Sequence, residues 1–358
     1  MKILFIMPQP LTEFSSRFRI KQFLPVLERE GIEYVVSPFV SPAFHKVIYT
    51  QGNFWKKLFY FVLGSLRRLM DLLKSSQFDC IFLQREAYPF GPALFERLFK
   101  IVSKKIVYDF DDALFVKAVS KFNRFIGWLK SAEKISQIIA LSDYVIAGNS
   151  FLYSYAKKFN SSVTIIPTCM DTDYYTVKKS YTSSKSIKIG WIGSHSTVYN
   201  LSLLSEVLQK LSFRYPVSVK IVGANFELPL KGVKIESVPW DGERELEYLK
   251  EFDIGIMPML DNIINLGKCG CKALQYMAVG TPAVASPVGV AGEIIEDGVS
   301  GFLCNTPEEW IEKLTFLIED ESLRKKIGLA GRERVERFYS VKAYANKFLE
   351  VLCMTAPK

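Results

Sequence analysis

Short apolar runs recur along the whole chain, separated by segments with helical periodicity. In the first half they lie within residues 1–7, 32–39, 78–84, 104–110, 143–149 and 162–168. In the second half they lie within residues 187–193, 217–223, 233–240, 252–258 and 282–286. A strand that reads as an unbroken apolar run is buried on both faces, as in a parallel sheet covered by helices. The sequence therefore predicts an α/β protein with two doubly wound, Rossmann-like sheets.

The polar segment TVKKSYTSSKS, residues 176–186, is the best linker in the chain because it lacks apolar periodicity. A length of 358 residues also exceeds what one hydrophobic core usually holds. We predict an N-terminal domain over 1–178, a C-terminal domain over 187–337, and a helix within 338–358 that Ser340 caps. That last helix packs either on the second domain or back on the first.

Cysteine and histidine usage argues against a disulfide framework and a metal site. The six cysteines lack regular spacing, only Cys269 and Cys271 are close, and His45 and His195 are the only histidines. A zinc site needs more ligands than these. We expect free, packed thiols, no metal, no signal peptide before the first strand, and a cytoplasmic location.

The positive charge is concentrated in the first half. Residues 1–180 hold 25 Lys and Arg against 15 Asp and Glu, whereas residues 181–358 hold 21 against 22. Such a field attracts nucleic acid, acidic lipid headgroups or lipid-linked diphosphates. Nucleic acid is disfavoured, because the basic residues are not interleaved with aromatics as in known modules.

Segment 54–74, FWKKLFYFVLGSLRRLMDLLK, predicts an amphipathic basic helix with a wide apolar face. Its uninterrupted apolar stretch, 58–66, is too short to span a bilayer, which takes about 20 residues. Two alternatives remain. The apolar face packs on the sheet, or it lies at a membrane surface, and the basic charge favours the membrane.

Two loops in the second half suit an anionic ligand, because ligands of such sheets bind beyond the carboxyl ends of the strands. GWIGSHSTVYN, residues 190–200, offers the hydroxyls of Ser194, Ser196 and Thr197 and a helix start. NLGKCGCKALQYMAVG adds Lys268 and Lys272 at a second helix start. Together they predict a diphosphate site, with solvated surface lysines as the alternative.

In the first half, YDFDDALF places Asp109, Asp111 and Asp112 directly after a buried strand. Burying carboxylates without a use is costly, so at least one should face a site. The alternative is a helix N-cap, most of all for Asp112. Glu86 is a further candidate, and Ser16, Arg17 and Arg19 could bind a phosphate.

The second half also resembles a known family. KALQYMAVGTPAVASPVGVAGEIIEDGVSGFL, preceded by FDIGIMP, is similar to the donor-binding signature of family-4 retaining glycosyltransferases of the GT-B fold. SSRFRI and REAYPFGPALFERL resemble the N-terminal domain of one bacterial branch. The resemblance implies two facing Rossmann-like domains with a cleft between them. It also implies metal-independent transfer of a sugar from a nucleotide-sugar to a glycan or lipid-linked acceptor, in bacterial surface polysaccharide or glycoconjugate synthesis.

The resemblance assigns roles one position at a time. Family members carry two glutamates eight positions apart, for the donor sugar and the ribose, and here Gly267 and Gln275 stand there. An amide can still bind ribose hydroxyls, but glycine cannot replace the other carboxylate. Trp240 either stacks on the base or packs in the core. Asp111 would orient the acceptor hydroxyl, with Asp109 and Glu86 next. Ser16, Arg17 and Arg19 would bind the acceptor. The implied donor-binding residues are Gly193, Ser194, Thr197, Trp240, Lys268, Lys272, Gln275 and Glu293.

The missing glutamates leave two other functions open. One is a non-catalytic subunit that binds nucleotide-sugar. The other is a nucleotide-sugar 2-epimerase, which needs more acid and base residues than this chain's two histidines readily supply.

Overall fold

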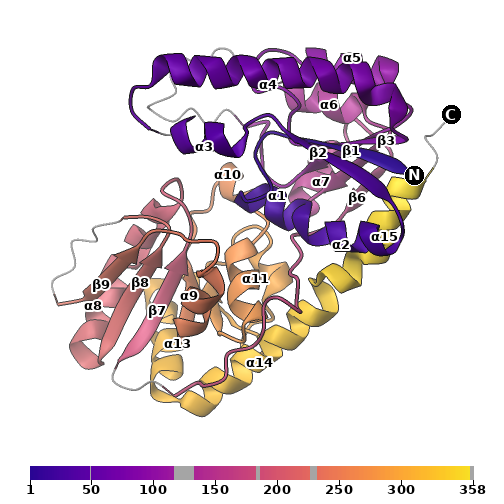
Figure 1. Cartoon of the computed structure of the whole chain (residues 1–358). Coiled ribbons are helices and arrows are strands. Elements are labelled where there is room, and N and C mark those ends of the chain that lie inside the picture. Colours follow the sequence, from indigo (N-terminus) through magenta and orange to yellow (C-terminus); the bar gives the residue numbers. More distant parts are fainter. Residues whose placement is uncertain (49, 117–132, 183–185, 226–231, 355–358) are drawn as a thin grey trace. The chain divides into compact units, whose positions relative to one another are not determined.

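The computed structural model describes residues 1–48, 50–116, 133–182, 186–225 and 232–354 (Figure 1). The chain separates into two compact units. The first unit comprises Met1–Thr168 and Tyr344–Lys358, and the second unit comprises Cys169–Ala343. The first unit thus ends before the segment 176–186 that the sequence suggested as a linker. That segment belongs to the second unit, and its residues 183–185 lie outside the described residues.

The first unit is built on a six-stranded parallel sheet in the order β2-β1-β3-β4-β5-β6. The strands are β1 (Lys2–Met7), β2 (Glu33–Pro38), β3 (Cys80–Gln84), β4 (Ile106–Phe110), β5 (Tyr144–Ala147) and β6 (Val163–Ile165). Every residue of β3 and β4 is buried, as expected for central strands covered on both faces. The predicted doubly wound sheet is confirmed.

Helices cover this sheet. They are α1 (Phe14–Arg19), α2 (Leu24–Arg29), α3 (Pro42–Ile48), α4 (Phe54–Lys74), α5 (Leu94–Val102), α6 (Lys134–Leu141) and α7 (Ser150–Ala156). After β1 the chain does not form one long helix but α1, a 3-10 turn at Lys21–Phe23 and α2. Pro25 causes the break, because proline is tolerated in the first turn of a helix but not in its interior.

The last helix, α15 (Val341–Cys353), belongs to the first unit from Tyr344 onward. Ser340 caps it by accepting a hydrogen bond from the Ala343 amide at 3.1 Å. The Phe348 ring stacks on Phe23, with 4.4 Å between the ring centroids. Lys105 Nζ donates to the carbonyls of Val351 and Leu352 at 2.6 and 2.9 Å. These contacts fix the C-terminal helix against the sheet.

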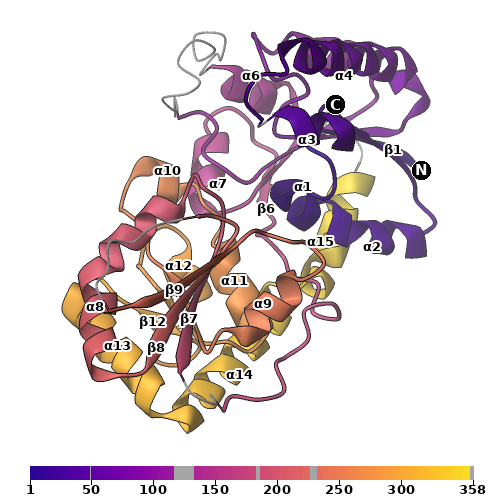
Figure 2. The same ribbon diagram turned by 60° about the vertical axis from the view of Figure 1, so that its left-hand side comes forward.

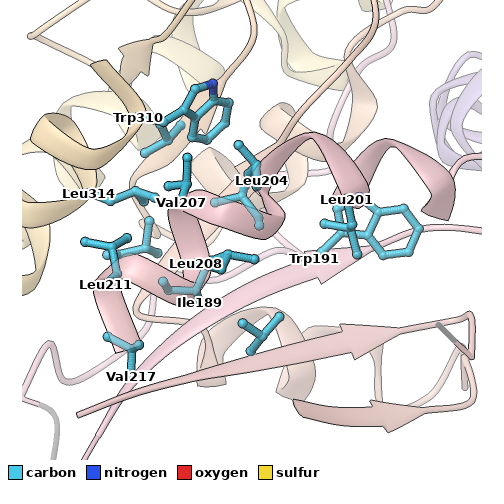
Figure 3. Close-up of a cluster of buried hydrophobic side chains, with 14 of the residues drawn as sticks. Ile189, Trp191, Leu201, Leu204, Val207, Leu208, Leu211, Val217, Trp310 and Leu314 are labelled. Atoms are coloured by element: carbon cyan, nitrogen blue, oxygen red, sulfur yellow. The ribbon is translucent and has the colours of Figure 1, made fainter. Parts of the chain in front are cut away.

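The second unit has its own six-stranded parallel sheet, in the order β12-β11-β10-β7-β8-β9. The strands are β7 (Ile187–Ile192), β8 (Val217–Val222), β9 (Lys234–Val238), β10 (Ile254–Met257), β11 (Ala283–Ala285) and β12 (Phe302–Leu303). Strand β12 was not predicted, because two residues carry no periodicity. Trp191, Leu204 and Leu208 are among the side chains that fill the core beside β7 (Figure 3).

The helices of the second unit surround this sheet (Figure 2). They are α8 (Ser205–Arg214), α9 (Glu245–Glu251), α10 (Ile263–Leu266), α11 (Cys271–Ala278), α12 (Ala291–Ile294), α13 (Pro307–Glu319) and α14 (Glu321–Phe338), with a 3-10 helix, η5, at Val198–Leu204. Thr306 and Glu309 form a capping box at the start of α13, and Asp320 caps α14.

Candidate functional site

Glycines and one tryptophan meet at the carboxyl ends of β7, β8 and β9. The Gly193 amide donates to the Val222 carbonyl at 2.9 Å. Gly223 has a positive φ of 91°, and a Cβ there would lie 2.3 Å from the Gly193 carbonyl oxygen and 3.3 Å from Trp240 Cβ. Only glycine allows this approach of the two loops. The bare backbone therefore lies beside Trp240, where a ligand can come close to the chain.

Lys272 reaches the same place from α11. Its Nζ lies 5.3 Å from the centroid of the Trp191 ring, and a Cβ on Gly193 would lie 2.7 Å from Lys272 Cε. Burial, reinforced by the charge of Lys268, lowers the pKa of Lys272 to about 8. Within the described part of the chain no carboxylate pairs with this ammonium. A half-buried cation in the first turn of a helix, without a counterion, is suited to hold an anion.

The hydroxyl-rich loop after β7 differs from its prediction. It leads into the 3-10 helix η5, and the Thr197 and Val198 amides donate to the Ser194 carbonyl at 3.0 and 3.2 Å. Two of the amides expected to bind phosphate are therefore already engaged. The hydroxyls of Ser194 and Ser196 lie 2.8 Å apart and are exposed, so they can reorient toward a ligand.

Lys268 and Glu293 lie on the loops around α11. Lys268 is half-buried just after α10, and its amide donates to the Asn265 carbonyl at 3.1 Å. Glu293 is exposed on α12, and its carbonyl accepts hydrogen bonds from Arg334 Nη2 and Tyr339 OH, both at 2.9 Å. The backbone of Glu293 is thus held in place.

Glu245, which sequence reasoning missed, anchors Gln275 and Trp240. It is fully buried at the start of α9 and accepts hydrogen bonds from Gln275 Nε2 at 3.0 Å, Trp240 Nε1 at 2.8 Å and Tyr175 OH at 2.6 Å. Gln275 is fully buried as well, and its Oε1 has no hydrogen-bond partner among the described residues. Trp240 is 39% exposed, so it is not a core tryptophan.

A signal for Glu245 was present in the sequence. Tyr248, Leu249 and Phe252 follow it at the spacing of one helix face, and all are buried. A carboxylate on such a face must find partners inside the fold.

In the first unit, Asp109 and Arg19 form a buried ion pair. They are 1% and 3% exposed, and Arg19 Nε lies 3.2 and 3.1 Å from the two carboxylate oxygens of Asp109. Arg19 Nη1 also donates to the carbonyls of Ile166 and Pro167 at 2.7 and 2.9 Å. Burial raises the pKa of Asp109 despite the opposing charge of Arg19. The pair replaces the predicted acceptor roles of both residues, because neither charged group is offered to a ligand.

Asp111 lies nearer the surface, at 12% side-chain exposure, among the ends of β3 and β4 and the start of α1. It accepts hydrogen bonds from Arg85 Nε and Ser15 Oγ, both at 2.7 Å. Burial favours the neutral acid, but Arg85, Arg19 and Ser15 outweigh it and lower the pKa of Asp111 to about 2. Buried Gln84 donates to Ser15 Oγ at 2.9 Å. Asp111 is thus ionised at any physiological pH.

Arg85 holds this cluster with a backbone that non-glycine residues rarely adopt. Its φ is 58°, and its amide donates to the Asp109 carbonyl at 2.8 Å. A left-handed residue costs about 1–3 kcal/mol and is retained where the surroundings enforce it, often at functional sites. The sequence did not single out Arg85, because a left-handed backbone has no sequence signal at a non-glycine residue.

The remaining N-terminal candidates have partners as well. Glu86 Oε1 lies 3.4 Å from Lys134 Nζ. Ser16 is buried and donates to Gln84 Oε1 at 3.0 Å, whereas Arg17 lies over the Phe18 ring at 4.6 Å. Asp112 accepts from the Ala113 amide at 3.0 Å. Asp112 was expected to cap the segment that follows it, and residues 117–132 lie outside the described residues.

Within the described residues, no group of three or more His, Cys, Asp or Glu side chains is placed to hold a metal ion. The cysteines are free thiols, and Cys269 is buried while Cys271 is half-buried.

Residues 186–320 of the second unit are similar to known proteins. Residues 186–320 match the family described as "Glycosyl transferases group 1". An uncharacterized glycosyltransferase of Methanocaldococcus jannaschii is 41% identical over 71 residues, 19% of this chain and 20% of that protein. A D-inositol 3-phosphate glycosyltransferase of Nocardioides is 32% identical over 84 residues, 23% of this chain and 18% of that protein. The chain thus spans about a fifth of the length of these curated relatives.

Solved structures resemble the whole chain in fold. A sucrose-phosphate synthase from Thermosynechococcus elongatus superposes with a TM-score of 0.69 at 12% identity, over 98% of each chain. HepE of Anabaena, in complex with UDP-glucose, superposes with a TM-score of 0.67 at 17% identity, over 98% of this chain and 99% of that one. At such identities the likeness concerns the fold alone. Residues 186–320 are thus similar to the group 1 glycosyl transferases, and the two parallel six-stranded sheets with their helices have a GT-B-like fold.

Proposed function

We propose that this protein is a retaining glycosyltransferase that moves a sugar from a nucleotide-sugar to an acceptor bound by the first unit. The observation that supports this most is Lys272, a half-buried ammonium without a counterion among the described residues, lying against the glycine loop after β7. A diphosphate placed there would meet a preorganised positive charge, and the charge that develops on the departing diphosphate would be stabilised.

The first unit supplies the acceptor side in this proposal. Asp111 accepts a hydrogen bond from the acceptor hydroxyl and orients it. A carboxylate with a pKa of about 2 is too weak a base to keep that proton. The proton therefore passes to the departing diphosphate as the hydroxyl attacks on the same face of the sugar.

The donor to test first is a UDP-sugar, because UDP-glucose is the ligand of the similar HepE structure. We further propose a glycan or lipid-linked acceptor in bacterial surface polysaccharide or glycoconjugate synthesis, at the cytoplasmic face of a membrane. The charge of the first unit supports an anionic partner, since it holds 25 Lys and Arg against 14 Asp and Glu.

A non-catalytic, nucleotide-sugar-binding subunit is the second candidate, and Gly267 and Gln275 in place of the family glutamates favour it. A thermal-shift panel of UDP-, GDP-, ADP- and TDP-sugars would identify the donor, because a ligand of the native state raises its melting temperature. Donor hydrolysis and transfer would then be measured. Binding without turnover toward any acceptor would replace the transferase proposal by the binding subunit.

A further inference from the structure

Helix α4 packs on the rest of the first unit through the side that carries Gly64 and Arg68, where the ring of Phe61 also lies beside that of Phe39. Gly64 and Arg68 are its buried residues, and a Cβ on Gly64 would lie 2.9 Å from the Phe39 carbonyl oxygen. Arg68 donates to the carbonyls of Ala87 and Met7, each at 2.7 Å, and pairs with Asp71 at 2.8 Å. The alternative that the apolar face packs on the sheet is therefore wrong.

The apolar face of α4 points to solvent instead. Ten of its apolar side chains are between 40% and 81% exposed: Phe54, Trp55, Leu58, Phe59, Val62, Leu63, Leu66, Leu69, Met70 and Leu73. In Figure 1 this helix lies along one margin of its unit. Contiguous apolar surfaces of this kind are rare on soluble monomers and mark interaction sites. We call these ten side chains the α4 face.

Charge decides what covers the α4 face. Lys56 and Lys74 are exposed on the same helix, 18 residues or about five turns apart, and so lie along one edge of the face. The helix has one acidic residue, Asp71, which is turned inward onto Arg68 and Ser37. The first unit of a second copy would bring a surplus of 11 positive charges against the equal surplus of the first unit here. An anionic surface complements both the apolar face and its basic edge.

The dimensions fit a helix that lies in a membrane surface. Its 21 residues extend over about 32 Å. In the described part of the chain, no helix has the length and apolar character needed to cross a bilayer. We propose that the α4 face docks on an anionic lipid bilayer, with its apolar side chains at the acyl boundary and Lys56 and Lys74 at the headgroups. This inference rests on the proposed membrane location and names the surface responsible.

The test is sedimentation with vesicles of phosphatidylglycerol and phosphatidylcholine, and with vesicles of phosphatidylcholine alone. No donor or acceptor is added, so the result is independent of the transfer assay. The wild type should sediment with the anionic vesicles, and less so as salt rises. Replacing Trp55 and Phe59 by serine should weaken binding about a hundredfold, at about tenfold for each lost aromatic contact.

The charge variant, Lys56→Gln with Lys74→Gln, should weaken binding about thirtyfold, since each lysine contributes about 1 kcal/mol near such a surface. All four substituted side chains are exposed, so the variants should keep the wild-type melting temperature. Matched controls in the second unit are Phe213→Ser, at a residue 71% exposed, and Lys325→Gln with Lys326→Gln. These should bind like the wild type.

Three results would overturn the proposal. The first is that the wild type does not sediment with the vesicles. The second is that the α4 variants sediment like their controls. The third is a concentration-dependent dimer that the Trp55 and Phe59 substitutions abolish, which would make the α4 face a contact between copies.

Discussion

Replacing Gln275 by glutamate should destabilise the second unit by about 4 kcal/mol at pH 7, and the loss should shrink in acid. Gln275 Nε2 lies 3.0 Å from Glu245 Oε1, and both side chains are fully buried. Two carboxylates at that distance repel by about 5 kcal/mol at an effective dielectric constant of about 20. Keeping one of them protonated at pH 7 costs about 4 kcal/mol from a reference pKa of about 4.3. The two carboxylates of the variant therefore hold one proton between them. The cost of holding that proton sets the loss of stability.

The sign of the pH dependence follows from that proton. The folded variant holds a proton that the unfolded chain has released, so its stability falls as the pH rises above about 4.3. At pH 5 the loss should be only about 1 kcal/mol by the same arithmetic. Urea unfolding of variant and wild type at both pH values measures this difference.

Two controls separate charge from packing. Gln209→Glu adds the same charge at a half-exposed position of α8 and should cost little. The double variant Glu245→Gln with Gln275→Glu has one carboxylate again, so its loss should no longer depend on pH. An equal loss at pH 5 and pH 7 in the single variant, or no loss, would refute the electrostatic reasoning.

Three further predictions concern charged groups. Lys272→Ala should weaken the binding of a nucleoside diphosphate, measured by calorimetry, more than the binding of the nucleoside. In the wild type, the affinity for the diphosphate should fall as the pH rises through about 8, because Lys272 loses its proton there. Equal losses for both ligands would remove Lys272 from the phosphate site. Asp111→Asn should abolish transfer, assayed with a radiolabelled donor, while donor affinity stays near wild type; retained transfer would move the role to Glu86. Arg19→Met should lower the free energy of unfolding by about 3–5 kcal/mol, because it leaves the buried Asp109 charge without its partner, and a loss below about 1 kcal/mol would contradict that.

The sequence predicted the sheets well because their strands are unbroken apolar runs, as in β3 and β4. It could not say which face of α4 is buried, since periodicity defines two faces without orienting them. Gly64 and Arg68 decide the orientation, through a close backbone approach and hydrogen bonds to β1 and to the loop after β3. No pattern in the sequence predicts either contact.

The polar networks were harder to predict because their members are distant in sequence. Arg19 and Asp109 are 90 residues apart, and Tyr175 and Glu245 are 70 apart. The sequence identified Asp109 and Gln275 as unusual but not their partners. A prediction from sequence rests on the neighbours of a residue along the chain. The burial and the partners of these residues depend instead on segments that are brought together by the sheet.

The place of α15 has a consequence for synthesis on the ribosome. Phe348, Val351 and Leu352 are buried, and Lys105, whose pKa burial lowers, is surrounded by carbonyls from the last turn of that helix. Most of the first unit is translated before the second, yet it lacks these side chains until residues 344–354 have been made. The second unit, by contrast, lies within one continuous stretch of chain. We therefore expect the second unit to complete its folding before the first unit, which keeps part of its core exposed in the nascent chain until α15 has been made.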